Sequence, residues 1–587
     1  MRTRSLFATL LAASIAVSTA AVGDKAWSDD DERDRGRGYQ NVIVLVPDGT
    51  AQTVATLARW WNDEPLNVDG DFAGAVRTYM SNSVITGSAA AATAFATGYK
   101  TTVRFIGVGP RPDDVLSTEE TPPEWIQYRP LATVLEAAKD KGKATGLIST
   151  SRITHATPAS YAAHIHDRGM DNEIMEHLVY QDVDLVFGGG KRHLLPEDEG
   201  GRRTDGENLI DELLSRGYEF VETKEEMDDA DGPKVWGMFA SSHMEADVDR
   251  DEFAPEQPSL AEMTRKALEL LSEDEDGLFL MIEGSQVDWA GHANDPYYMM
   301  TDFLAFDEAY GVAVEFAEEN GDTLVIAFPD HNTGGMTIGH YETRVPYTAT
   351  TVADLLGPLV TMDTTSTGIT STGLERMIDA DVRDGLALPQ AIAENLDEWW
   401  GIPGLNQPLC SDEQETDDLV DEILALEPEV GLAYAIAEVI SRNCTVFGWT
   451  TNGHTGEDVP LWVHDADEAY GVIENTELAE IVAEAMKANL DRLNQKLYVD
   501  AKEAFPEAGL DMSDPTNPVL VIGRARLPVS KDLVEIDGRT HRLEGIVVHA
   551  PLAPTANPLP ETSTTGKVYI PEEAVRIINR GSRGRRN

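Results

Sequence analysis

Basic side chains are scarce in this chain of 587 residues. Only 46 Lys and Arg stand against 103 Asp and Glu, which gives a formal net charge of −57. This balance argues against nucleic acid as a partner, because a phosphate backbone would be repelled. The carboxylates are spread along the whole chain, which favours a strongly hydrated surface adapted to high salt. An ordinary acidic exported protein is the alternative.

Cysteine is also rare, with only Cys410 and Cys444 in the whole sequence. Two cysteines allow one disulfide at most. Export to an oxidising compartment would permit the pair to form. They could equally be two separate thiols, because the sequence does not give the distance between them.

Long apolar runs are missing except near the N-terminus, where two arginines precede an apolar run at 6–17 and small residues at 18–21. This run is too short for a confident membrane span and is typical of a secretory signal. A retained membrane anchor is the weaker alternative. We therefore expect a signal peptide at 1–21, a disordered charged linker at 22–40, and a mature chain without a transmembrane anchor, exported to the periplasm or the extracellular space.

Apolar runs of strand length alternate with helical patterns through most of the mature chain. The expected strands cover 41–46, 144–150, 182–190, 278–284 and 323–328, and the expected helices cover 133–143, 261–271 and 302–319. Continuous apolar strands separated by helices predict an α/β fold, a three-layer sandwich with a central, mostly parallel sheet. In such sheets the chemistry gathers just beyond the carboxyl ends of the strands.

The stretch ITGSAAAATAFATG, residues 85–98, has a single serine in front of a run of alanines. Gly87 and Ser88 form a turn into a helix start, and the alanines are strong helix formers. Ser88 would then lie beside free backbone N–H groups and the positive end of the helix dipole, which suits an anion. Capping the helix is the commoner role for a serine here, and the rest of the chain must decide.

Carboxylates and imidazoles follow three of the predicted strands and a later turn. They are Asp48, Glu283 with Asp288 and His292, Asp330 with His331, and His454. Each alone is weak evidence, since an Asp after a strand is usually a turn former. Gathered at one sheet edge, they would repel one another unless cations neutralised them. The pattern therefore predicts a cluster of divalent metals, and the four-residue spacing of Asp288 and His292 would place both on one face of a helical turn.

Six motifs in this order resemble the alkaline phosphatase family. They are VPDGT at 46–50, TGSAAAATAFATG at 86–98, THATPASYAAHIHDR at 154–168, IEGSQVDWAGH at 282–292, PDH at 329–331 and GHTGED at 453–458. The resemblance implies a metal-dependent hydrolase of phosphate monoesters with a broad substrate range. It also implies a homodimer and release of inorganic phosphate through a covalent phosphoserine.

The resemblance also assigns roles to single residues. Ser88 matches the nucleophile, and Arg168 matches the guanidinium that binds two phosphate oxygens. The first zinc site is matched by Asp288, His292 and His454, the second by Asp48, Asp330 and His331, and the third, usually magnesium, by Asp48, Thr157 and Glu283. Two zinc ions can stabilise both the entering and the leaving oxygen of an in-line displacement, and an all-oxygen ligand set suits magnesium.

Three positions depart from the commoner pattern of the family. Gly87 stands where many members carry Asp, so a hydrogen bond to Arg168 is expected to be missing and the arginine to be more mobile. His155 stands near the third metal where some members carry Asp, which leaves the identity of that metal open. Trp289 stands where others carry Lys or His, and we expect His155 and Trp289 to line the substrate pocket; simple packing is the alternative for Trp289.

Two stretches fall outside the resemblance. We expect a catalytic domain at 41–504 with a variable insertion at about 341–444, beside the active site. Residues 505–587 contain short β-like runs, including KVYIPEEAVRIIN, and are expected to form a small β-rich C-terminal domain.

Two other functions compete with this interpretation. One is a phosphodiesterase or sulfatase on a related metal-bearing fold. Arg168 and the three-metal set favour a monoester instead, and no sulfatase nucleophile motif is present. The other is an inactive, metal-dependent phosphate-binding protein, which the intact Ser88 and the complete ligand set disfavour.

Overall fold

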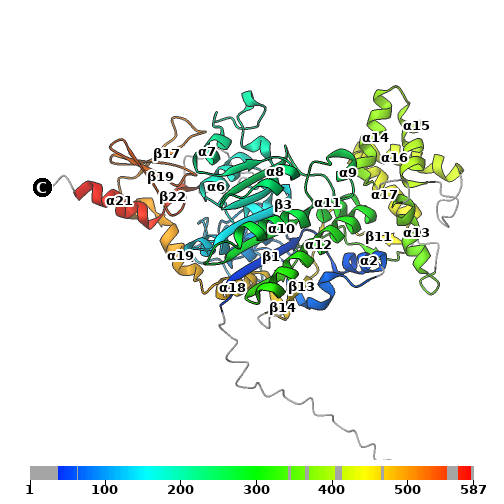
Figure 1. The fold of residues 1–587 in the computed structure, drawn as a ribbon, viewed down its shortest axis with the longest axis horizontal. Helices are drawn as coiled ribbons and strands as arrows, with labels where there is room; N and C mark the ends of the chain where they lie inside the picture. Colours follow the sequence, from blue (N-terminus) through cyan, green and yellow to red (C-terminus); the bar gives the residue numbers. More distant parts are fainter. Residues whose placement is uncertain are drawn as a thin grey trace, which may run out of the picture. The chain divides into compact units, whose positions relative to one another are not determined.

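A ten-stranded sheet lies at the centre of the computed structural model, which describes residues 38–62, 64–340, 346–363, 369–402, 413–464, 469–551 and 566–583 (Figure 1). The strand order is β14-β2-β13-β8-β1-β7-β3-β4-β6-β5. Neighbouring strands are parallel except where β13 pairs with β2 and β8. The strands are β1 Asn41–Pro47, β2 Phe72–Arg77, β3 Ala144–Arg152, β4 Leu185–Gly189, β5 Glu219–Val221, β6 Val235–Ala240, β7 Leu278–Gly284, β8 Thr323–Ala327, β13 Val459–His464 and β14 Gly471–Glu474.

Both faces of the sheet are covered by helices, as the alternation along β1 shows. Ile43 and Leu45 belong to one buried cluster, which includes residues of α10 (Leu260–Leu271) and α12 (Pro296–Asn320). Val42 and Val44 point the other way, into a cluster shared with α3 (Ser88–Thr97) and α4 (Val134–Asp140). The mostly parallel, three-layer α/β architecture expected from the sequence is therefore confirmed.

Further helices and short strands surround the central sheet. They are α2 Gln52–Asn62, α5 Ala156–Ala159, α6 Asp171–Tyr180, α7 Leu209–Ser215, α8 Lys224–Asp229, α9 Arg250–Phe253, α11 Gln286–Ala293, α18 Asn475–Ala485, α19 Leu490–Leu497 and α20 Ala501–Ala504, with strands β9 Asn332–Thr333, β10 Thr337–Ile338, β11 Phe447–Gly448 and β12 His454–Thr455. Some of them, such as α2, α6 and α18, add side chains to the two buried clusters of the sheet.

One helix begins earlier than its sequence pattern indicates. The helix expected at 302–319 begins at Pro296, because the Asp295 side chain accepts hydrogen bonds from the backbone N–H groups of Tyr297 and Tyr298. Proline in the first turn is favourable, since its missing N–H would have no helical partner there. The Asp-Pro pair was the available signal for this start.

The region at 341–444 is helical in the part that the structure describes. Its helices are α13 Val352–Asp363, α14 Ser371–Arg383, α15 Leu388–Trp400, α16 Glu413–Val430 and α17 Leu432–Cys444. α17 contacts α11, which places this helical region beside the segment that carries Asp288 and His292 (Figure 1). Cys444 is disulfide-bonded, while Cys410 lies outside the described residues.

The C-terminal region forms two small antiparallel sheets and a helix. One sheet has the order β16-β17-β18-β19-β20 and the other β15-β22-β21. The strands are β15 Val499–Asp500, β16 Gly509–Asp511, β17 Val519–Ile522, β18 Ala525–Pro528, β19 Leu533–Ile536, β20 Arg539–Arg542, β21 Val548–Pro551 and β22 Gly566–Ile570. Describing KVYIPEEAVRIIN as wholly β-like was wrong: Pro571 follows β22, and α21 occupies Glu572–Arg583.

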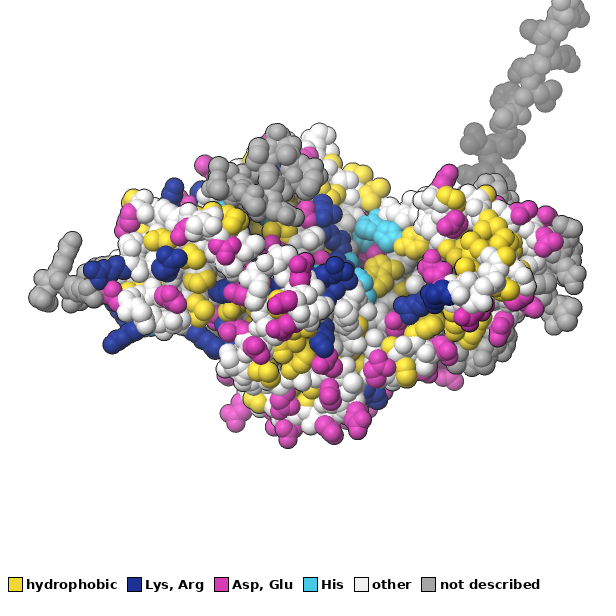
Figure 2. All heavy atoms as spheres, turned by 90° about the horizontal axis from the view of Figure 1, so that it is seen from above, with side chains coloured by type: hydrophobic (Ala, Val, Ile, Leu, Met, Phe, Trp, Pro, Cys, Tyr) yellow, Lys and Arg dark blue, Asp and Glu magenta, His cyan; other side chains and the backbone are white. Residues whose placement is uncertain are grey.

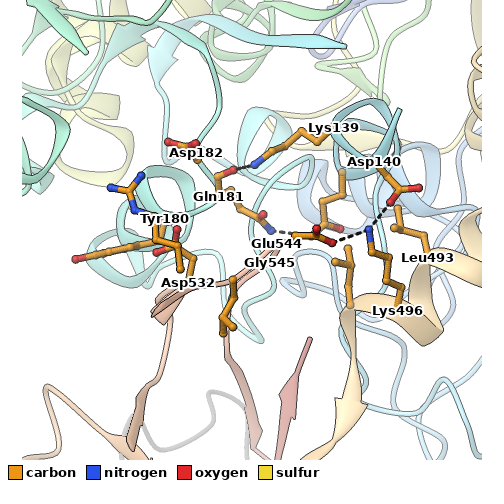
Figure 3. A pocket seen from close by; sticks show the side chains of 14 residues that line it. Lys139, Asp140, Tyr180, Gln181, Asp182, Leu493, Lys496, Asp532, Glu544 and Gly545 are labelled. Carbon is orange, nitrogen blue, oxygen red and sulfur yellow. Dashed lines mark hydrogen bonds and ion pairs between the residues drawn. The ribbon is translucent and has the colours of Figure 1, made fainter. Parts of the chain in front are cut away.

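Ion pairs join the C-terminal strands to the helices around the central sheet. Lys496 in α19 contacts Asp140 at 2.6 Å and Glu544 at 2.9 Å, across a cavity of about 350 Å³ (Figure 3). Close by, the buried Arg216 donates to both carboxylate oxygens of Asp532, at 3.0 and 2.8 Å. A bidentate pair of this kind fixes orientation as well as position, so the C-terminal sheets are held firmly against the layer of α4 and α7.

The helices of the described residues include none that is both long and apolar enough to cross a membrane. The proposed signal peptide at 1–21 and most of the linker at 22–40 lie outside the described residues.

Candidate active site

Three adjacent parallel strands deliver carboxylates to one edge of the sheet. β1 lies between β7 and β8, and Val46 at its carboxyl end is in register with Glu283 of β7. Asp48 therefore follows β1 beside Glu283, while Asp330 follows β8. The three carboxylates are buried. Asp330 Oδ1 accepts a hydrogen bond of 3.1 Å from the Gly49 backbone N–H, which ties the β8 exit to the β1 exit.

Asp288, His292 and His454 form the first group able to hold a metal. The helix α11 does place Asp288 and His292 together, with 3.4 Å between Asp288 Oδ2 and His292 Nε2. His454 Nε2 lies 3.6 Å from Asp288 Oδ1 and 3.3 Å from His292 Nε2. Three ligand atoms, two from α11 and one from β12, therefore lie close together.

Backbone carbonyls orient both imidazoles of this group. His292 Nδ1 donates to the carbonyl of Asn452 at 2.5 Å, and His454 Nδ1 donates to that of Thr86 at 2.8 Å. Each ring consequently directs Nε2 at the cluster, where a metal ion would bind it in place of a proton. This arrangement is typical of metal-binding histidines, and sequence reasoning did not reach it because the carbonyl partners are distant in the chain.

His331 lies among the second group of ligands. Its Nε2 is 3.7 Å from Asp48 Oδ1 and 3.1 Å from Asp330 Oδ2, and Asp288 is near enough to share an ion with Asp48 and His331. Both carboxylate oxygens of Asp48 and Oδ2 of Asp330 lack a hydrogen-bond partner among the described residues. A buried carboxylate without partners is costly, so a cation fits this place.

A third group surrounds Glu283. Its Oε2 accepts hydrogen bonds from Ser149 and Ser285, whereas Oε1 has no partner among the described residues. The Thr157 hydroxyl and His155 Nδ1 are also buried and have no hydrogen-bond partner among the described residues. Asp48, His155 and Glu283 can share one ion. The structure thus adds His155 to the oxygen set Asp48, Thr157 and Glu283.

The electrostatics of the cluster call for positive charge. Burial raises the pKa of Asp48 well above its usual range, and the neighbouring Asp330, Asp288 and Glu283 raise it further. Burial also lowers the pKa of His331 well below its usual range, so this imidazole stays neutral. Ionised carboxylates with neutral imidazoles are the ligand forms that bind zinc, and cations would supply the missing charge.

Ser88 is the first residue of α3 and does not cap it. Gly87 is the N-cap, and no side-chain capping bond is present at this helix start. The buried Ser88 hydroxyl instead lies 3.2 Å from His331 Nε2. Capping, the commoner role of a serine in such a stretch, is therefore not its role here. The hydroxyl faces the metal-ligand cluster at the positive end of a helix.

Arg168 stands at the side of this cluster and contacts His155, with 2.7 Å between Nη2 and His155 Nε2. Trp289 packs edge-on against His155 and His243, with ring centroids 5.9 and 4.4 Å apart. The structure therefore brings Arg168, His155 and Trp289 to one wall. His243 was missed by sequence reasoning, although its place after the apolar strand at 235–240 was an available signal.

Comparisons with known proteins agree with this geometry. The family model described as "Alkaline phosphatase" matches residues 39–488. Alkaline phosphatase 3 of Bacillus subtilis is 32% identical over 82% of this chain and 97% of its own length. The repressible alkaline phosphatase of Saccharomyces cerevisiae is 33% identical over 77% of this chain and 82% of its own length.

Solved structures show the same likeness. The alkaline phosphatase of Thermus thermophilus has a TM-score of 0.64 and 26% identity, covering 78% of this chain and 93% of that one. The cold-active enzyme of Shewanella sp. has a TM-score of 0.62 and 26% identity, covering 76% of this chain and 99% of that one. The chain therefore belongs to the alkaline phosphatase family and is a metal-dependent hydrolase of phosphate monoesters.

Proposed function

We propose that this enzyme transfers the phosphoryl group of its substrate to Ser88 and releases it to water in a second step. The observation that carries the proposal is the position of the Ser88 hydroxyl at the start of α3, 3.2 Å from His331 and beside the unpartnered oxygens of Asp48 and Asp330. A protein that only binds phosphate, without hydrolysing an ester, would not need a nucleophile at that point.

The Ser88 Oγ attacks phosphorus and its proton passes to solvent, the ester P–O bond breaks, and the leaving alkoxide takes up a proton from solvent and departs as an alcohol. Water then attacks the phosphoserine, which frees the Ser88 hydroxyl and inorganic phosphate. Arg168 holds two phosphate oxygens through its planar fork, and the N-terminus of α3 adds backbone N–H donors. Bound metal ions would stabilise the entering and leaving oxygens.

The donor sets support two zinc ions and one magnesium ion. Asp288, His292 and His454 would hold the first zinc, and Asp48, Asp330 and His331 the second, because zinc accepts carboxylate and imidazole ligands. Asp48, Thr157 and Glu283 are oxygen donors and suit magnesium. The nitrogen of His155 beside them would also accept a softer ion.

The substrate range, assembly and location belong to the same proposal. A broad range of small phosphomonoesters would suit a site that holds mainly the phosphate. The leader-like residues 1–21 support export to the periplasm or the extracellular space. A homodimer, a catalytic domain at 41–504 and a β-rich C-terminal domain at 505–587 stay predictions.

A choice between monoester and diester substrates tests this function. We expect kcat/KM for p-nitrophenyl phosphate to exceed that for bis-p-nitrophenyl phosphate by about 10³-fold, because a monoester dianion offers Arg168 and bound cations one more non-bridging oxygen and one more negative charge than a diester. The Arg168→Gln variant should lose most of this preference. A diester preference in the unmodified enzyme would favour the phosphodiesterase alternative and contradict the proposal.

A further inference from the structure

Four arginines follow one another away from the candidate active site, in a chain with a formal charge of −57. They are Arg168, Arg152, Arg192 and Arg202. Figure 2 shows Lys and Arg side chains beside the His side chains where this face is hollowed, while Asp and Glu are scattered over the rest of the face. A local excess of positive charge on such an acidic protein needs a cause.

The contacts connect this arginine row to the active site. Arg168 lies 2.7 Å from His155 Nε2, and the His155 ring is 5.9 Å from that of His243. His243 Nε2 is in turn 2.6 Å from Nη1 of Arg152. Arg152 is the last residue of β3, which pairs with β7, the strand that carries Glu283. These contacts link Arg168 to Arg152, and Arg152 in turn lies near enough to Arg192 to influence its charge.

A cavity of about 330 Å³ lies next to the row. It begins at Gly169, the residue after Arg168, and its lining includes Asn172, Arg192, His193 and Arg202. Asp171 and Glu173 also line it, so the walls are not purely cationic. The Asp171 carboxylate is engaged by Arg152 Nε at 2.7 Å and by the hydroxyl of Thr154 at 2.5 Å.

Arg192 and Arg202 are the cations of this cavity that lack a counter-charge. Among the residues that the structure describes, neither lies within ion-pair distance of a carboxylate. Their sequence neighbours do: Lys191 contacts Glu222 and Arg203 contacts Asp205. Burial lowers the pKa of Arg192 and the nearby charge of Arg152 lowers it further; Asp171 acts in the opposite direction, and Arg202 adds to the lowering. Like charges held together beside a cavity indicate a place for an anion.

We propose that Arg192 and Arg202 form a subsite for a second phosphate group carried by the substrate, so that the enzyme favours molecules with two phosphates over otherwise equal monophosphates. This proposal rests on the proposed function, because the first phosphate must lie at Ser88 and Arg168. The forked guanidinium groups match phosphate geometry, and the cavity lined by Gly169, Arg192 and Arg202 has room for a phosphate group and its hydration.

The test compares fructose 1,6-bisphosphate with fructose 6-phosphate. The measured quantity is the ratio of their kcat/KM values, taken from initial rates of phosphate release. We expect the Arg192→Gln/Arg202→Gln variant to lower this ratio about 10-fold relative to the unmodified enzyme, since each lost phosphate contact is a charge-assisted hydrogen bond. The matched control is Arg539→Gln/Arg542→Gln, which removes two exposed charges from β20 and should leave the ratio unchanged.

Three results would overturn the subsite. The first is an unchanged kcat/KM ratio in the Arg192→Gln/Arg202→Gln variant. The second is an equal fall of this ratio in the control variant, which would indicate a general effect of charge. A variant that alters only the inhibition by inorganic phosphate would show that the arginines hold a free anion. Failure of the proposed function is separate: it would appear as Ser88→Ala retaining activity on both sugars, whatever the ratio in the arginine variant.

Discussion

The Ser88→Ala variant should lose at least about 10³-fold in kcat for p-nitrophenyl phosphate, because the attacking oxygen is removed while the binding groups stay. Such a loss corresponds to ~4 kcal/mol of transition-state stabilisation. Ser88 makes no capping bond in α3, so the variant should keep its thermal midpoint to within about 2 °C. Steady-state kinetics and thermal unfolding of the same preparation check both statements.

Ser83→Ala is the matched control for this prediction. Ser83 lies on the segment that leads into α3, and its hydroxyl accepts a hydrogen bond from the backbone of Ile85 rather than facing the ligand cluster. This variant should keep kcat within a factor of about two. If Ser88→Ala and Ser83→Ala had equally small effects, the hydroxyl of Ser88 would have no part in the chemistry.

Chelation of divalent ions should abolish turnover and lower the thermal midpoint by several degrees or more. Asp48, Asp330 and Glu283 each keep at least one buried oxygen that has no hydrogen-bond partner among the described residues, so removing cations leaves unsatisfied and mutually repelling charge. Activity and midpoint should both return when Zn²⁺ and Mg²⁺ are added back. Activity assays and thermal unfolding with and without chelator measure the effect.

The fall in thermal midpoint that chelator causes should become larger as the pH rises. The pKa of Asp48 is raised in the folded, metal-free protein, so this state keeps a proton that the unfolded chain releases above about pH 4. Its stability therefore falls as the pH rises towards the raised pKa. In the metal-loaded protein Asp48 would be ionised and would face cations, so the stability of this form should not decrease over the same pH range.

A variant separates this mechanism from general effects of the chelator. Asp48 belongs to two of the three groups able to hold a metal, so Asp48→Ala should make the thermal midpoint much less sensitive to chelator. An unmodified enzyme with the same activity and midpoint in chelator and in Zn²⁺ would contradict the metal-centre interpretation.

The sequence predicted the layers of the fold because burial on both faces of a parallel sheet leaves continuous apolar strands. The β1 run at 41–47 is such a strand, and its side chains alternate between two clusters. Helix starts that depend on a capping side chain were harder to predict. The start of α12 at Pro296, earlier than expected, is an example. The helix α21 was missed because EEAVRIIN also contains β-branched residues.

The positions of the metal-ligand residues after the strands could be predicted from the sequence, but the orientation of their side chains could not. The tautomers of His292 and His454 depend on carbonyls of Asn452 and Thr86, which no local pattern connects to them. His243 reaches the site wall from the segment after β6, and its only sequence signal was the apolar strand before it. Such contacts depend on tertiary packing between distant segments, and only the structure supplies them.

The most direct test of the account is to quench the enzyme with acid during turnover of a phosphomonoester and locate the phosphoryl group by peptide mass spectrometry. The account predicts one added phosphoryl group on the peptide that contains Ser88, and none in the Ser88→Ala variant. An actively turning-over enzyme with no phosphorylated peptide, or with the group on another residue, would contradict the phosphoserine mechanism.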